Sequence, residues 1–251
     1  METPSYIALS SQSVLRRKMD LIAHNIANAN TTAYQGEYLL FQEYVDDTKD
    51  RKAGDLRDVS LVQDIASVRD TAAGPLLRTE NPLDLAIVGD GFFAIETEDG
   101  RRYTRNGSFT LNADGEIVTN HGHIVPMDNG QPARIPPDAS LIEISRDGVI
   151  SARVDGTDVR IGRIQPYRVE DPESLLRGPA NLYKLDEEAE ILADADSEIV
   201  QGSIEQSNVT AMLEMTSMID VVRTYASVSR MVTSEHERQQ RAIRTLAGQS
   251  S

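Results

Sequence analysis

The sequence predicts a mainly β protein with α-helices at its ends: an antiparallel β domain is inserted between N- and C-terminal helices that pair as a coiled coil. Three observations lead to this fold class. Glycine and proline, which interrupt regular elements, are absent from residues 5–35 and 203–247 and concentrated between 74 and 179. Both uninterrupted ends carry apolar residues about every seven positions, which indicates helices. The middle carries short apolar runs separated by turn dipeptides, which indicates strands.

Residues 1–36 are predicted to form an N-terminal assembly helix. Its apolar residues lie on one narrow helical face, which Ser11, Lys18 and Asn25 interrupt. Asn28 and Asn30 follow, and asparagine is a poor helix former, so the helix should end there.

Residues 37–74 are predicted to be an extended linker or loop region. The run 46–58 is densely charged, which favours an exposed loop. The Gly54 region fits a turn within it.

Residues 75–201 are predicted to form a β-rich outer domain. Strand-like runs alternate with turn dipeptides about every eight residues, which is typical of a meandering antiparallel sheet or a barrel. The dipeptides are Asp90-Gly91, Asp99-Gly100, Asn106-Gly107 and Asp114-Gly115.

Residues 202–251 are predicted to form a C-terminal assembly helix that packs with the N-terminal helix. Two adjoining seven-residue rows, one through Met215 and Val222 and one through Met218 and Tyr225, form an apolar seam. A helix over 203–247 would be ~68 Å long, at about 1.5 Å per residue. A chain of this size cannot bury such a helix alone, so the N-terminal helix and neighbouring subunits are the expected partners.

Composition excludes several classes of protein. The 251 residues include 25 Lys+Arg and 40 Asp+Glu, a net charge of −15, so nucleic acid is not an expected partner. Without cysteine there is no disulfide framework, zinc ribbon or thiol nucleophile. No run is long and apolar enough for a membrane span, and the start at Met1 shows no cleaved signal peptide.

Candidate chemistry is weak. Gly89-Asp90-Gly91 lacks the helix that a dinucleotide fingerprint needs, and a tight turn explains it better. His121 and His123 are too few for a metal site, and the acidic runs 186–190 and 194–198 indicate solvated surface. We therefore expect no enzyme activity, cofactor, metal or small-molecule substrate. Two alternatives stay open: a periplasmic carbohydrate-active enzyme that uses the acidic β domain, and a binding module with coiled-coil dimerisation.

Several sequence blocks in a fixed order resemble flagellar basal-body rod and hook proteins. The N-terminal block includes Leu-Ser-Ser-Gln at 9–12 and Ile-Ala-His-Asn-Ile-Ala-Asn-Ala-Asn-Thr-Thr-Ala-Tyr at 22–34. The middle blocks are Gly-Asp-Gly-Phe-Phe at 89–93 and Tyr-Thr-Arg-Asn-Gly-Ser-Phe at 103–109, and Gly-Ser-Ile-Glu-Gln-Ser-Asn-Val at 202–209 closes the pattern. Ala33-Tyr34-Gln35 departs from the family's usual Gly-Phe-Lys.

The resemblance implies a structural subunit of the bacterial flagellar rod, most similar to proximal-rod members, with a distal-rod subunit as the alternative. Such subunits stack helically into a hollow drive shaft that crosses the periplasm, transmits torque and passes exported subunits. The implied partners are other copies, other rod subunits and the flagellar type III export apparatus. Phe41 and Val45 are similar to a short apolar export element, although such a loose pattern also fits plain packing.

The seams and the resemblance together predict an assembly interface. Its residues are Ile7, Val14, Leu15, Leu21, Ile22, Asn25, Ile26, Asn28, Asn30, Met215, Met218, Ile219, Val222, Tyr225, Val232, Ile243 and Leu246. Because the stripes are narrow, we expect both ends to be poorly ordered in the free subunit and to fold on assembly. Residues 1–36 hold three basic and two acidic side chains and 203–247 hold five of each, so the excess acid lies in the middle, away from the seams.

Overall fold

The computed structural model describes residues 3–45, 60–171, 174–186 and 189–248, and the chain divides into two compact units. We call the first the helical unit; it comprises Met1–Ala27, Glu37–Arg69 and Thr210–Ser251. The second, the β unit, comprises Asn28–Gly36 and Asp70–Val209. Both units are therefore assembled from segments that are far apart in the sequence.

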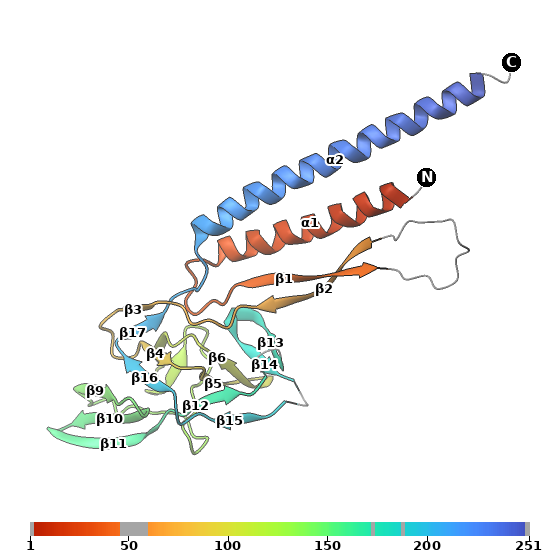
Figure 1. Ribbon diagram of the computed structural model, residues 1–251. Helices are drawn as coiled ribbons and strands as arrows, with labels where there is room; N and C mark the ends of the chain where they lie inside the picture. Colours follow the sequence, from red (N-terminus) through yellow and green to blue (C-terminus); the bar gives the residue numbers. More distant parts are fainter. Residues whose placement is uncertain (1–2, 46–59, 172–173, 187–188, 249–251) are drawn as a thin grey trace. The chain divides into compact units, whose positions relative to one another are not determined.

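The helical unit contains two helices and a two-stranded ribbon. Its elements are α1 (Thr3–Ala27), α2 (Ala211–Gly248), β1 (Glu37–Val45) and β2 (Ser60–Arg69). The helices contact each other, and α1 also contacts both strands. Figure 1 shows α1 and α2 running antiparallel, with the chain termini at the same end of the unit. The predicted mainly β fold with terminal helices is thus present.

The predicted linker over 37–74 is wrong for much of its length. β1 and β2 pair as antiparallel strands over their whole length, with a register shift between Leu40 and Phe41. The two strands are separated in sequence by the charged run 46–58. Because the pattern of one segment does not show which distant segment it pairs with, the sequence did not predict this ribbon. The run itself, and the turn predicted within it, lie outside the described residues.

The predicted start of the C-terminal helix is also wrong. Ser203–Glu205 forms strand β17 and pairs with β3 (Leu76–Arg78), while α2 begins at Ala211. Its 38 residues give a length of about 57 Å at the usual helical rise. The absence of glycine and proline from 203–247 permitted a helix from residue 203 onward, but residues 203–205 pair with a distant strand instead.

The β unit is built from short strands, and the pairings among its described strands are antiparallel. Besides β3 and β17, they are β4 (Leu85–Val88), β5 (Phe92–Thr97), β6 (Gly100–Thr104), β7 (Phe109–Leu111), β8 (Ile117–Thr119), β9 (Leu141–Ile144), β10 (Val149–Val154), β11 (Thr157–Arg163), β12 (Pro166–Val169), β13 (Leu175–Arg177), β14 (Tyr183–Leu185), β15 (Ile191–Ala193) and β16 (Glu198–Gln201). A short 3₁₀ helix, η2, spans Pro179–Asn181.

Strand order shows that the β unit is not a simple meander. The largest sheet has the order β13-β14-β6-β5-β12-β15, and a second has the order β11-β10-β9. Strands β4, β3 and β7 form two-stranded pairs with β16, β17 and β8. The antiparallel prediction is confirmed. Consecutive strands pair in β5-β6, β7-β8, β9-β10-β11 and β13-β14, but other neighbours are distant in sequence, such as β6 beside β14.

The two faces of β5 belong to two different cores. Phe93 and Ile95 belong to the larger buried cluster, whereas Phe92 and Ala94 belong to the smaller one. Successive strand residues point to opposite faces, so β5 is covered on both sides. Its ring contacts follow the same division: Phe93 packs edge-on against Phe109, and Phe92 against Tyr183.

Candidate assembly interface

One face of α2 is partly covered along much of its length. Its half-buried or buried positions recur at alternating spacings of three and four residues, the period of a helix face that packs on a partner helix. They are Ala211, Glu214, Met218, Val221, Tyr225, Val228, Val232 and Glu235, and Ser229 beside Val228 is also half-buried. Val221 is only 6% exposed, and α1 is the helix that α2 contacts. We call this row the inner stripe.

The predicted seam divides between two faces of α2. Met218, Tyr225 and Val232 lie on the inner stripe, whereas Met215 and Val222, assigned by sequence to the same seam, are exposed. The seven-residue spacing correctly located two apolar rows. It did not show which row α1 covers, and it missed Val221 and Val228.

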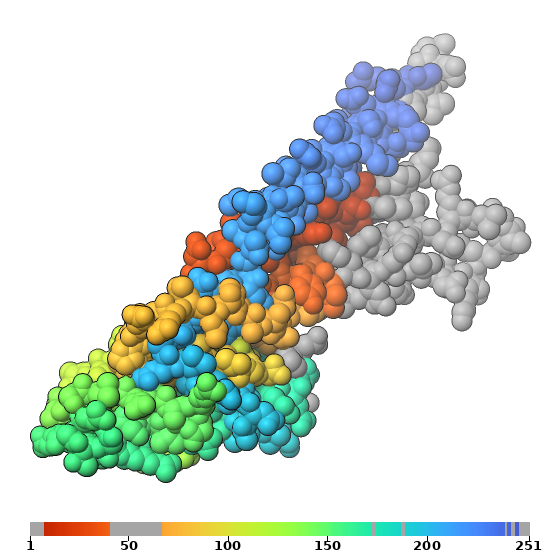
Figure 2. Space-filling model, turned by 60° about the vertical axis from the view of Figure 1, so that its left-hand side comes forward, coloured from red at the N-terminus to blue at the C-terminus, as the bar shows by residue number. Residues whose placement is uncertain are grey.

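The exposed apolar row, which we call the outer stripe, consists of Met212, Met215, Ile219 and Val222. These residues also follow spacings of three and four, and Met212 is 77% exposed. Figure 2 shows α2, in blue, open to solvent along much of its length on the face drawn. Helix α2 is therefore apolar on two faces, and only one of them is covered among the described residues.

The α1 seam residues lie partly out of solvent. Ile22 is buried, and the other described members of the predicted row are half-buried: Val14, Leu15, Leu21 and Ile26. Arg16 Nη2 donates to Tyr225 Oη at 3.2 Å, and this hydrogen bond raises the pKa of Arg16. Ile7, Ile243 and Leu246 lie within the two helices, but their side chains fall outside the described residues.

Asn25 has a role that its heptad position did not predict. Its Nδ2 donates to Glu37 O at 2.9 Å, and Glu37 N donates to Asn25 Oδ1 at 3.1 Å. The side chain is therefore bonded to the first residue of β1. It ties the end of α1 to the ribbon within the helical unit.

The remaining predicted residues occupy other places. Asn28 lies in the turn after α1, where its backbone carbonyl accepts from Thr31 N, and Asn30 is exposed. Neither lies on the seam, because α1 has already ended. Phe41 and Val45 lie in β1, but their side chains fall outside the described residues, so their predicted export role stays a prediction.

In the β unit, a buried ion pair joins two of the sequence blocks. Arg105 Nε donates to Glu205 Oε2 at 2.8 Å, and the two side chains are 3% and 1% exposed. Arg105 Nη1 also donates to the carbonyls of Gly89 and Gly91, while Gly74 N donates to Glu205 Oε1. Neither role was predicted from the sequence. The sequence offered one signal for the pair: Arg105 and Glu205 are the charged residues of the blocks 103–109 and 202–209.

Asn208 makes a second set of backbone contacts in the β unit. Its Oδ1 accepts from Gly36 N at 2.8 Å, and its Nδ2 donates to the carbonyls of Asp70 and Ala72. This side chain thereby links its own segment to Gly36 and to residues 70–72, which are distant from it in sequence. The closing block around 202–209 therefore organises the β unit before α2 begins.

Other classes of site are not visible in the described part of the chain. Among those residues, no group of three or more His, Cys, Asp or Glu side chains is arranged to hold a metal ion. None of the described helices is long and apolar enough to cross a membrane.

Comparison with family models identifies the class of protein. Residues 6–35 match the model described as "Flagella basal body rod protein", residues 86–152 match "Flagellar hook protein FlgE/F/G D1 domain", and residues 200–245 match "Flagellar basal body rod FlgEFG protein C-terminal". The matched segments include most of both helices, the Arg105 block and the Glu205 block.

Full-length relatives narrow this class. The chain is 35% identical over 247 residues to the flagellar basal-body rod protein FlgF of Caulobacter vibrioides, covering 98% of each chain. It is 33% identical to FlgF of Rhizobium meliloti over 99% of each chain. It is 30% identical to FlgG of Bacillus subtilis, covering 92% of this chain and 94% of the relative. The chain belongs to the flagellar basal-body rod protein family and is a structural subunit of the flagellar basal body.

Proposed function

We propose that the chain is a subunit of the proximal rod, which assembles helically into the hollow drive shaft across the periplasm, transmits torque and lets exported subunits pass. The proximal position is supported by identities of 32–35% to three FlgF proteins, against 27–30% to several FlgG proteins. A distal-rod subunit is the alternative. Family membership favours the structural role over the carbohydrate-active enzyme.

The exposure of the outer stripe of α2 is the observation that best supports assembly through this helix. Four large apolar side chains on one helix face remain in contact with water in the isolated chain. Burying a side chain of this kind stabilises a complex by about 1.5–3 kcal/mol before the costs of association. We infer that neighbouring subunits cover this stripe, with coiled-coil packing of α1 and α2 forming the inner tube and the β unit facing outward.

A charge placed on the outer stripe tests this proposal. The double substitution Met215→Glu and Ile219→Glu should abolish incorporation into basal bodies and motility, because it buries two carboxylates in the subunit contact. Ser217→Glu is the matched control, since Ser217 is exposed and lies off both stripes. The purified variants should unfold like the parent chain, because the substituted side chains are already exposed. Normal motility of the double variant would contradict assembly through the outer stripe.

Complementation separates the two rod positions. Expressed in strains lacking either the proximal or the distal subunit, the chain should restore motility only in the first. Restoration of the distal-deficient strain alone would favour the alternative. Either result is compatible with assembly through α2, because proximal-rod and distal-rod subunits have related helices.

Export is part of the same proposal. The chain would pass through the flagellar type III apparatus before it folds into the assembled rod, and Phe41 and Val45 would serve as an apolar recognition element. Phe41→Asp with Val45→Asp should lower secretion, while Tyr38→Asp, at an exposed β1 position, should leave it unchanged. Equal loss in both variants would indicate a general defect of the ribbon instead.

A further inference from the structure

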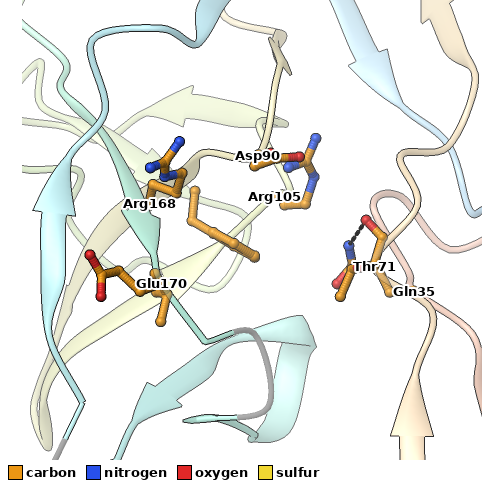
Figure 3. Close-up of a pocket in the computed structure, with 8 residues that line it drawn as sticks. Gln35, Thr71, Asp90, Arg105, Arg168 and Glu170 are labelled. Carbon is orange, nitrogen blue, oxygen red and sulfur yellow. Dashed lines mark hydrogen bonds between the residues drawn. The ribbon is translucent and has the colours of Figure 1, made fainter.

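The β unit contains a cavity of about 460 Å³ on the side of β12. It is lined by Gln35, Thr71, Asp90, Phe92, Arg168 and Glu170, together with Arg105 and Val169. Figure 3 shows the Gln35 and Thr71 side of this space facing Arg168 and Glu170. The volume lies within the range of about 300–1,000 Å³ that is usual for ligand sites.

Gln35 contributes an acceptor that no described group satisfies. Its side chain is only 2% exposed, and its Nε2 donates to Thr71 O at 3.4 Å. Its Oε1 is buried and has no hydrogen-bond partner among the described residues. A buried carbonyl oxygen is almost always paired, so a ligand that enters this cavity should bring an N–H or O–H donor to it.

The charges of the cavity favour a cation. Asp90 and Glu170 are exposed carboxylates at the rim, and Arg168 is the exposed basic residue beside them. Arg105 also lines the cavity, but its charge is matched by Glu205 and its Nη1 donates to two backbone carbonyls. An anion would meet the two carboxylates, and one without an O–H or N–H group would have no donor for Gln35 Oε1.

The shape of the lining favours a cation on an apolar stem. Phe92 and Val169 are buried residues that add apolar surface to the lining of the cavity. The methylenes of an arginine side chain can cover such a surface while the head group reaches the carboxylates. The planar guanidinium can donate to Gln35 and to a carboxylate at the same time, which a lysine ammonium does less well.

We propose that this cavity binds an arginine side chain presented by a peptide segment of another protein. The guanidinium donates to Gln35 Oε1 and pairs with Asp90 and Glu170, while Arg168 pairs with an acidic residue near that arginine. The site lies in the β unit and does not depend on the helical stripes, so its failure would leave assembly untouched.

Titration of the isotopically labelled full chain with acetyl-Gly-Arg-Gly-amide tests the proposal by NMR. The expected result is saturable shifts of the Gln35 side-chain amide and of the residues around 168–170. Acetyl-Gly-Lys-Gly-amide should bind at least several-fold more weakly. Equal binding of both peptides would overturn guanidinium recognition, and equal binding of free guanidinium would overturn recognition of a peptide-borne side chain.

Matched variants show whether the cavity itself binds. Gln35→Met keeps the length of the side chain but removes the acceptor, and it should weaken binding about tenfold, the usual effect of losing a hydrogen bond to a charged group. Gln131→Met, at an exposed position outside the cavity, should have no effect. Unchanged binding in Gln35→Met would overturn the proposal.

Substitutions of exposed charged residues test the site even if Gln35→Met fails to fold. Asp90→Asn and Glu170→Gln alter surface residues and should each weaken binding several-fold. Asp138→Asn makes the same change of net charge at an exposed position away from the cavity. If Asp138→Asn weakens binding as much as Asp90→Asn, the attraction is a diffuse effect of the acidic chain and the proposed site is wrong.

Discussion

The side chain of Asn25 is hydrogen bonded to both backbone polar groups of Glu37, at 2.9 and 3.1 Å. The buried amide of Asn25 offers one donor and one acceptor side by side, so it makes the same pair of hydrogen bonds to Glu37 that a residue of a neighbouring strand would make. The last turns of α1 are thereby fastened to the start of β1. An asparagine that reads as a polar interruption of a helical seam is in fact the link between helix and ribbon.

Replacing Asn25 should destabilise the helical unit. Asn25→Ala leaves the Glu37 N–H and carbonyl without these partners, and each lost bond should cost about 1–3 kcal/mol. Hydrogen exchange at the Glu37 amide should accelerate, and α1 should lose protection with it. Asn30→Ala, at an exposed position after the helix, is the control and should leave exchange unchanged. If both variants behave alike, the Asn25 contact is not what holds α1 to β1.

The Arg105–Glu205 pair should be a main determinant of β-unit stability. Glu205→Gln removes one charge of a buried pair and should lower the free energy of unfolding by about 3–5 kcal/mol, measured by urea denaturation. Asp158→Asn breaks the exposed Arg153–Asp158 pair and should change stability far less, because solvent screens exposed pairs. Similar midpoints for the two variants would show that burial does not strengthen the first pair.

Asp194 should make the β unit sensitive to acid. Burial opposes its ionisation, but hydrogen bonds from the Ser197 hydroxyl and from the backbone N–H groups of Asp196 and Ser197, with the charge of Arg168, lower its pKa overall. A lowered folded-state pKa stabilises the fold above the unfolded value of about 3.9. This contribution disappears as the pH falls through the folded-state pKa.

The measurement is stability as a function of pH below about 5, the range in which an aspartate of this kind takes up its proton. Ser197→Ala removes the hydroxyl donor and should raise the pKa of Asp194 toward its usual value, so the slope of stability with pH should become shallower. Asp196→Asn, at an exposed neighbouring position, should keep the parent slope. An unchanged slope in Ser197→Ala would mean that this donor does not set the pKa.

Gly107 should tolerate no side chain. A Cβ there would lie 1.8 Å from Leu85 O and 2.9 Å from the Phe93 ring, so Gly107→Ala must push apart the backbone and the larger core. Overpacking of this kind costs about 1–3 kcal/mol, and sometimes more. Gly122→Ala has open space but a φ of +83°, so it should cost about 1 kcal/mol. Thermal unfolding of both variants would show whether the close approach outweighs the backbone conformation.

Limited proteolysis should separate the two units in the unassembled chain. The β unit has two buried clusters and the Arg105–Glu205 pair, so a resistant fragment spanning about 70–209, the continuous part of that unit, is expected. Sites in α1 and in the last turns of α2 should be cut first, and assembly should protect them. Full protection of both ends in a dilute monomer would contradict folding on assembly.

Turn dipeptides show the limit of local sequence signals. Asp99-Gly100 lies at the β5–β6 connection and Asp114-Gly115 at the β7–β8 connection, and both are hairpins as predicted. The chain at Asp90-Gly91 and Asn106-Gly107 instead leads into strands that pair elsewhere. A glycine in such a dipeptide permits a tight turn, but it also permits two chain segments to approach closely. The dipeptide alone therefore does not show that a hairpin forms.

The sequence by itself determined what depends on near neighbours: the two terminal helices, their apolar period, the short strands between them and the family signature. Helical and strand periods are set by residues a few positions apart, so they can be read directly. Only the tertiary structure decided which α2 stripe α1 covers, that Asn25 bonds to Glu37, and that Glu205 lies beside Arg105. Each depends on segments brought together across the chain, where the choice of partner follows from burial and hydrogen bonding of the whole fold.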